Sequence, residues 1–105
     1  MEFVIDFLGR QTVIRPGTQD SLRGKWGFTD INKLEIEYGD HLAEANQKET
    51  VFHETIHLCD LLTCTDADEL SEAQVQRIGC LLFSLLRDNR HLTRWIFGFN
   101  NEEVW

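Results

Sequence analysis

The hydrophobic period of the sequence changes near residue 42, and this change limits the folds that the chain can adopt. Before it, short apolar runs and alternation predominate: Leu34, Ile36 and Tyr38 alternate with charged residues, which is typical of a strand with one buried face. After it, apolar residues recur every three or four positions, as in amphipathic helices. Strands followed by helices define the α+β class. We therefore predict a small antiparallel sheet with two or three helices packed on one face.

Turn residues divide the first 40 residues into two pairs of short strands. Gly9 separates the members of the first pair and Asn32 those of the second, as expected for hairpins. The stretch 18–25 between the pairs has no strand pattern and is predicted to be a loop. The predicted strands are 2–8, 11–14, 26–30 and 33–38.

Two long helices are predicted after the strands. The first covers residues 42–62, with Asp40 or Asn46 as its N-cap. The second starts at Ser71, which has Gln74 three residues on, in the spacing of a capping box, and it runs through residue 87. Both helices are long enough to present one face to the sheet and the other to solvent.

The second predicted helix carries an apolar stripe at helical spacing, which we expect to lie in the core. The stripe consists of Val75, Ile78, Leu82 and Leu85. A short third helix is expected to follow, with Asn89 as its N-cap. The three tryptophans are expected to pack in the core or between helices; they are Trp26, Trp95 and Trp105.

The length of the chain suits one domain, and its charge disfavours some partners. Its 105 residues, 42% of them hydrophobic, form a single predicted domain over 1–105 with a small core. Ten Lys and Arg against eighteen Asp and Glu give a formal net charge of -8, so a phosphate backbone would be repelled. We expect neither a nucleic-acid partner nor a membrane.

The cysteines and the first residues predict the compartment. Three cysteines without a Cys-x-x-Cys pair do not form a disulfide framework. The segment 1–6 carries acids where a signal peptide needs a basic flank, and its apolar run is too short to span a bilayer. These features predict a protein of the reducing cytoplasm.

His53, Glu54 and His57 form a His-Glu-x-x-His motif in the first predicted helix. Histidines four residues apart project from the same helix face, so both imidazoles can bind one Zn²⁺ while the glutamate lies beside its open coordination position. This is the pattern of the zincin metal helix, in which the glutamate is the general base.

Two other interpretations of the motif stay open. In the first, the histidines are ordinary polar residues of an amphipathic helix, and in the second the site holds a metal without catalysing a reaction. Cys59 and Cys64 are weaker candidate ligands, because their spacing from the histidines does not fit a zinc finger and buried free thiols are common.

A catalytic zinc site needs a third protein ligand and leaves a fourth position for water. No Lys or Arg lies between Lys48 and Arg77, so the surroundings of the histidines are electronegative. Glu72 is the preferred ligand because it lies in the first turn of a rigid helix, although favourable interaction with the helix dipole is its alternative role. The other candidates are Asp68, Glu69 and Gln76.

The segments around the motif resemble small phage and prophage zinc metallopeptidases, minimal relatives of the ImmA/IrrE-like gluzincins. The similar segments are 50–57, 70–75, 81–83 and 86–89, within a resemblance that spans residues 30–97 and takes in 27–30. The resemblance implies a zincin-like fold, a zinc ion held by His53, His57 and Glu72, and Glu54 as general base. Larger relatives carry their ligand glutamate deeper in the second helix, where Gln76 stands in this chain.

The activity that the resemblance implies is hydrolysis of a peptide bond in a protein of the host cytoplasm. Zincins generally pair an extended substrate with an edge strand, and 33–38 is predicted to be that edge. Tyr38 and His91 are candidate oxyanion partners, and both have ordinary packing roles as the alternative. The competing class is a non-catalytic module in which zinc, or the bare fold, supports an acidic surface that binds a protein.

Overall fold

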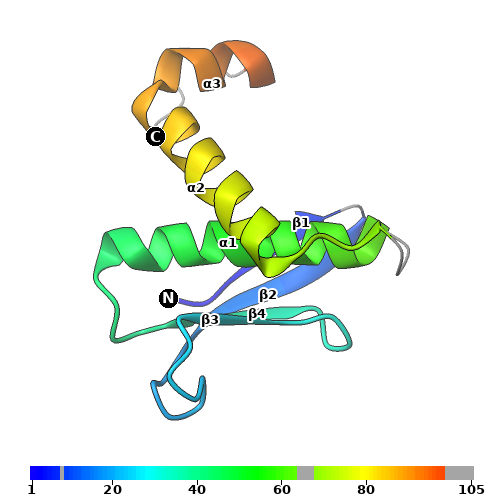
Figure 1. Cartoon of the computed structure of the whole chain (residues 1–105), viewed down its shortest axis with the longest axis vertical. Helices are drawn as coiled ribbons and strands as arrows, with labels where there is room; N and C mark the ends of the chain where they lie inside the picture. The colour runs from blue at the N-terminus through cyan, green and yellow to red at the C-terminus, as the bar shows by residue number, and fades with distance from the viewer. Residues whose placement is uncertain (8, 64–67, 99–105) are drawn as a thin grey trace.

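A four-stranded sheet precedes three helices, which confirms the predicted α+β class (Figure 1). The computed structural model describes residues 1–7, 9–63 and 68–98. The strands are β1 (Phe3–Phe7), β2 (Arg10–Gly17), β3 (Gly27–Asp30) and β4 (Glu35–Gly39), and the helices are α1 (Glu44–Thr63), α2 (Glu72–Asp88) and α3 (Arg90–Phe97). The two predicted strand pairs are both present as antiparallel neighbours, β1 with β2 and β3 with β4.

The sheet is mixed, so the prediction of a purely antiparallel sheet is wrong in one pairing. The strand order is β1-β2-β4-β3, and β2 runs parallel to β4. After β2 the chain turns through 18–25 and returns as the outer strand β3, and the next turn sends β4 back between β3 and β2. This arrangement sets Ile14 beside Ile36 in register, and both side chains are buried.

The predicted edge strand 33–38 is in the interior of the sheet, because β4 has a partner on each side. The edges are β1 and β3. The strand β2 continues to Gly17, beyond its predicted end at residue 14. Pro16 is tolerated there because β1 pairs only with 10–14, so β2 has one neighbour at Pro16 and no second ladder that requires an N–H.

The helix α1 lies across one face of the sheet and closes the core (Figure 1). The buried apolar side chains at this contact are Ile14, Ile36, Tyr38 and Leu58. Ile36 and Tyr38 alternate with the less buried Glu35 and Glu37, which confirms the predicted buried face of this strand. The core therefore fixes α1, the helix that carries the His-Glu-x-x-His motif, on a rigid platform.

The helix ends agree with the predictions in one case and differ in two. The Ser71 side chain accepts from the Gln74 backbone while the Gln74 side chain accepts from the Ser71 backbone, so the predicted capping box is present. Asn46 lies inside α1, which begins at Glu44. Asn89 precedes α3 without a side-chain cap, because its Nδ2 donates to the Leu85 carbonyl at the end of α2 instead.

The apolar stripe of α2 is mostly exposed, which contradicts its predicted place in the core. Val75 is buried, but Ile78, Leu82 and Leu85 are 36%, 41% and 46% exposed. The helix α1 covers only the neighbouring side of α2, where Gly79 is buried. The period of the stripe correctly predicts which residues share a face, but only Val75 at the start of this face is buried.

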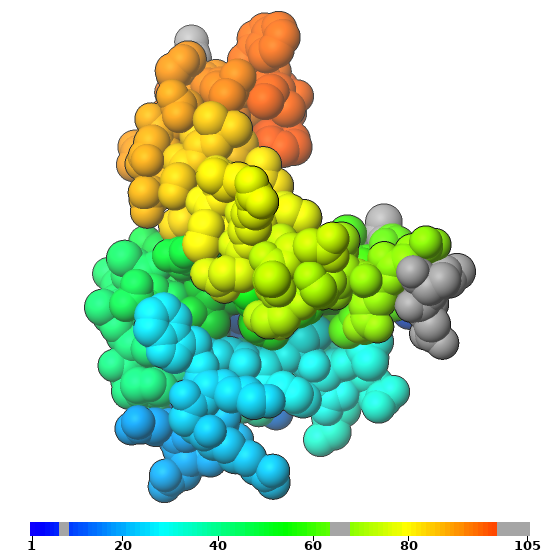
Figure 2. Space-filling view, viewed as in Figure 1, coloured from blue at the N-terminus to red at the C-terminus, as the bar shows by residue number. Residues whose placement is uncertain are grey.

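The last part of the described chain extends away from the sheet, and only its first turns contact α1, through Gly79 and Phe83. Figure 1 shows α2 leaving α1 and α3 lying at its far end, and Figure 2 shows the same segment projecting from the rest of the surface. We call residues 77–98 the arm. The radius of gyration is 14.5 Å, whereas about 13 Å is expected for a compact domain of this length.

Two tryptophans that were expected to be buried are exposed, so this prediction is wrong. Trp26, just before β3, is 53% exposed, and Trp95 on α3 is 81% exposed. Trp105 lies outside the described residues. Among the described residues, no helix combines the length and apolar character that crossing a bilayer requires.

Candidate metal centre

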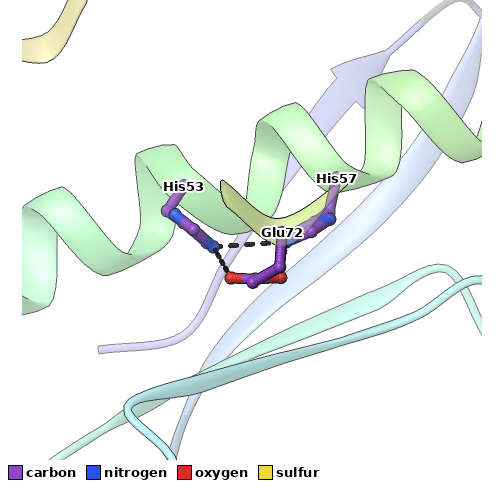
Figure 3. A group of neighbouring side chains, drawn as sticks. All are labelled: His53, His57 and Glu72. Atoms are coloured by element: carbon purple, nitrogen blue, oxygen red, sulfur yellow. Dashed lines mark hydrogen bonds and ion pairs between the residues drawn. The ribbon is translucent and has the colours of Figure 1, made fainter. Parts of the chain in front are cut away.

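The helix α1 presents His53 and His57 one turn apart on the same face, as predicted (Figure 3). Their Nε2 atoms are 3.2 Å apart, and the side chains are 14% and 21% exposed. The rings meet edge to face, with centroids 4.9 Å apart. Both imidazoles therefore aim one nitrogen at a shared point near the surface.

Glu72 completes the group from the start of α2 (Figure 3). Its Oε1 lies 2.8 Å from Nε2 of His53, and its Oε2 lies 2.8 Å from Nε2 of His57. The buried carboxylate of Asp60 accepts from the Leu70 backbone N–H at 3.0 Å, and this contact holds the chain that leads into α2. The preferred third ligand is thus placed against both histidines.

The other candidate ligands are not part of this group. In the described part of the chain, the His, Cys, Asp and Glu atoms that converge within 4.8 Å belong to His53, His57 and Glu72 alone, so Asp68, Glu69 and Cys59 are outside it. Gln76 donates from Nε2 to the Cys80 sulfur at 3.2 Å instead. Cys64 lies outside the described residues.

Two glycines allow the neighbouring elements to approach α1 closely. A Cβ at Gly79 would lie 3.5 Å from Ile56 Cδ1 and 3.9 Å from the His53 Cα, so α2 passes directly over the first histidine. A Cβ at Gly27 would lie 2.6 Å from Cγ2 of Thr50 and 3.1 Å from Cγ of Glu54, so β3 passes beside the motif glutamate. The site is built where three elements meet.

Glu54 lies beside the histidines and is oriented by Thr29. The residue is 8% exposed, and its Oε2 is 3.9 Å from Nε2 of His53. The Thr29 hydroxyl donates to its Oε1 at 2.7 Å and also lies 3.1 Å from the Glu54 backbone oxygen. Thr29 is not identifiable from the sequence, because no local pattern distinguishes it from the other threonines before the sheet order is known.

An open cleft of about 690 Å³ runs over the site between β3, α1 and α2. Besides the motif residues and Glu72, it is lined by the half-exposed aromatic residues Trp26 and Phe28 and by Thr29. A volume of this size lies within the range of ligand-binding clefts, about 300–1,000 Å³. The cleft gives a bound chain access to the edge strand β3 and to the histidines at the same time.

One wall of the cleft contains a thiol that is held protonated. Cys80 donates to Oε1 of Glu49 at 3.3 Å, and this hydrogen bond, with burial and the charge of Glu49, raises the pKa of the Cys80 thiol above its usual value. A metal ligand or nucleophile needs the thiolate. Cys80 therefore lines the cleft as a neutral group.

The two candidate oxyanion partners, Tyr38 and His91, do not line the cleft. The Tyr38 hydroxyl donates to the Met1 carbonyl at 2.7 Å and accepts from the Met1 amino group at 3.0 Å. Its side chain is buried in the core and does not line the cleft. His91 is exposed on α3, outside the cleft.

Hydrogen bonds alone explain the arrangement of His53, His57 and Glu72 poorly. With Glu72 ionised, both of its contacts require a proton on each imidazole Nε2. The two N–H groups of His53 and His57 then face each other at 3.2 Å. Without these protons, the lone pairs of both Nε2 atoms and of the Glu72 oxygens point at one another and repel. A divalent cation accepts all of these lone pairs, and two imidazoles with a carboxylate form a donor set that suits zinc.

Comparisons of the chain with protein-family models, with curated proteins and with solved structures find no match. The interpretation of the site therefore depends on its own geometry.

Proposed function

We propose that the protein is a zinc-dependent peptidase that hydrolyses a peptide bond of a cytoplasmic protein, with zinc held by His53, His57 and Glu72. The observation that carries this proposal is the convergence of both imidazoles on one carboxylate, directly beside a buried glutamate. A three-ligand site leaves a position for water, which is the feature that separates catalytic from structural zinc sites.

When bound, zinc would lower the pKa of its water towards 7 and polarise a carbonyl oxygen. Glu54 would act as the general base that takes a proton from this water, because its carboxylate lies next to His53 and lines the cleft. The Thr29 hydroxyl holds Oε1 of Glu54 and leaves Oε2 directed towards the histidines. Glu54 subsequently delivers the proton to the leaving nitrogen.

The edge strand β3 is the proposed docking site for the substrate backbone. It lines the cleft through Gly27, Phe28 and Thr29, and on one side it has no neighbouring strand among the described residues. An extended peptide can therefore add to the sheet and lie across the histidines. This assignment replaces the interior strand β4.

Replacing Glu54 with Gln tests the catalytic part of the proposal. Glu54→Gln keeps the shape and the Thr29 contact but cannot accept a proton, so we expect hydrolysis to fall by at least about a hundredfold while zinc content stays the same. Mass spectrometry of a random peptide library incubated with each zinc-loaded protein measures cleavage. His53→Ala is the matched control, in which both zinc and cleavage are lost.

The competing proposal is a zinc-binding module without catalysis. It is favoured by the positions of Tyr38 and His91 outside the cleft, because neither of these candidate oxyanion partners lies where a peptide would bind. Equal library products from the wild type and Glu54→Gln, with zinc bound to both, would support this module and refute the peptidase.

A further inference from the structure

The arm exposes an apolar surface that the described part of the chain leaves uncovered. On α2, Val75 of the predicted stripe is buried, and Leu81 lies beside the three exposed members. The exposed stripe, with exposed fractions of 36% to 64%, therefore consists of Ile78, Leu81, Leu82 and Leu85. On α3, Trp95 and Ile96 are 81% and 52% exposed. The α2 residues are neighbours because they lie three or four positions apart, and a contiguous exposed apolar patch on a small protein indicates an interaction site.

The stripe of α2 is self-complementary. Its positions 78, 81, 82 and 85 are symmetric about the midpoint between Leu81 and Leu82. In two antiparallel copies of α2 that cross at this midpoint, Ile78 faces Leu85 of the other copy, and Leu81 faces Leu82. An isologous dimer requires a patch that matches itself in this way.

Two charged residues beside the stripe, Arg77 and Asp88, also fit antiparallel pairing of two α2 helices. With 3.6 residues per turn, Arg77 and Asp88 lie on the same flank of the stripe, near its opposite ends. Antiparallel pairing about a twofold axis brings Arg77 of one copy next to Asp88 of the other, twice. Within the described residues Arg77 has no ion-pair partner, and Asp88 pairs only with its exposed neighbour Arg87.

The arm also has room for a second copy. Beyond its first contacts with α1, the arm projects from the rest of the molecule (Figures 1 and 2). We therefore expect that two arms can pack while the two sheets stay apart. A stable dimer buries about 800 Å² per partner, which is more than four half-exposed aliphatic side chains supply. The interface therefore needs α3 as well, and Trp95 and Ile96 provide large exposed side chains there.

We propose that the protein forms a twofold-symmetric dimer through the arm, in which the α2 helices pack antiparallel along the stripe and α3 extends the contact. This dimer does not depend on zinc, because the stripe lies outside the metal centre. The alternative binding partner of the arm is an anionic surface, since residues 77–98 carry four arginines and one aspartate.

Sedimentation equilibrium of the full chain tests the dimer. We expect the wild type to dimerise at micromolar concentration, with or without a chelator, and Leu81→Glu to be monomeric with an unchanged circular dichroism spectrum. Val4→Glu is the matched control, because Val4 is 56% exposed on β1 and receives the same charge far from the arm. A monomeric wild type, or a Leu81→Glu variant that still dimerises, would overturn the proposal.

A charge exchange tests the antiparallel arrangement. Arg77→Asp places two like-charged pairs across the interface, so we expect the dimer dissociation constant to rise about tenfold. Arg77→Asp combined with Asp88→Arg should restore the wild-type constant. If the double variant is as weak as the single one, the arrangement is wrong. A monomeric wild type that binds vesicles of phosphatidylserine would assign the arm to an anionic surface instead.

Discussion

Single side chains decide whether this site can activate water. His53 and His57 define a point, but Glu54 acts there only if its carboxylate is held towards them, and the contact that holds it comes from Thr29 on another element. The motif was predictable because helical spacing is a local property. Thr29 was not predictable because its place beside Glu54 depends on the order of strands in the sheet.

Replacing Thr29 tests this positioning role, which presupposes the proposed peptidase. Thr29→Val keeps the shape but removes the donor to Oε1 of Glu54, so we expect kcat to fall about tenfold to hundredfold, as for the loss of a hydrogen bond to a charged group. Thr29→Ser should retain most activity because it keeps the hydroxyl. Zinc content should be equal in all three proteins. A wild-type kcat in Thr29→Val would refute the positioning role.

The thiol of Cys80 gives a second test at this scale. Glu49 raises the pKa of Cys80, so the folded protein contains less of the reactive thiolate at a given pH than an unperturbed cysteine would. Glu49→Gln removes the negative charge and should lower this pKa, so alkylation of Cys80 by iodoacetamide at pH 8 should become faster. Peptide mapping by mass spectrometry measures the rate, with Cys59 as the internal control. A rate that does not change, or that falls, contradicts the assigned contact.

At the scale of elements, the metal centre depends on how closely α2 crosses α1. The capping box at Ser71 and the helical period made the start of α2 predictable from sequence, and with it the position of Glu72. The same helical period could not predict which residues of α2 are buried by a neighbouring element. It placed Val75 and Leu82 on one stripe, yet α1 buries the first and leaves the second exposed.

Substitutions of Gly79 test the crossing. Its missing Cβ would be in ordinary contact at 3.5 Å from Ile56, so Gly79→Ala should fit and stabilise α2 by about 0.5–1 kcal/mol. Gly79→Leu should overpack the crossing and destabilise the protein by about 1–3 kcal/mol. We also expect the leucine variant to bind zinc more weakly, because α2 carries Glu72. Urea unfolding and zinc titration measure these changes, and equal zinc affinity in both variants would contradict the account.

At the scale of the whole molecule, the proposed metal would link two parts of the fold that also pack against each other. The proposed ligands His53 and His57 belong to the helix on the sheet, and Glu72 belongs to the helix that continues into the arm. The α+β class followed from sequence because strands and helices have different local periods. The parallel pairing of β2 with β4 and the projecting arm did not, because both depend on contacts between segments far apart in sequence.

Removing the metal should therefore lower the stability of the whole fold. A ligand that binds only the folded state stabilises it by about 2.7 kcal/mol when its free concentration is a hundred times its dissociation constant. We expect a chelator to lower the melting temperature of the wild type in differential scanning calorimetry. His53→Ala should melt at the same temperature with and without chelator. A wild type that is indifferent to chelation would refute a structural contribution of the metal.

X-ray absorption at the zinc edge of the zinc-loaded protein is the sharpest test of the proposed metal centre, because it identifies the atoms bound to the ion. We expect one zinc per chain with two imidazole nitrogens, oxygen in the remaining positions and no sulfur. A sulfur ligand, a single imidazole or the failure of the protein to retain zinc would contradict it.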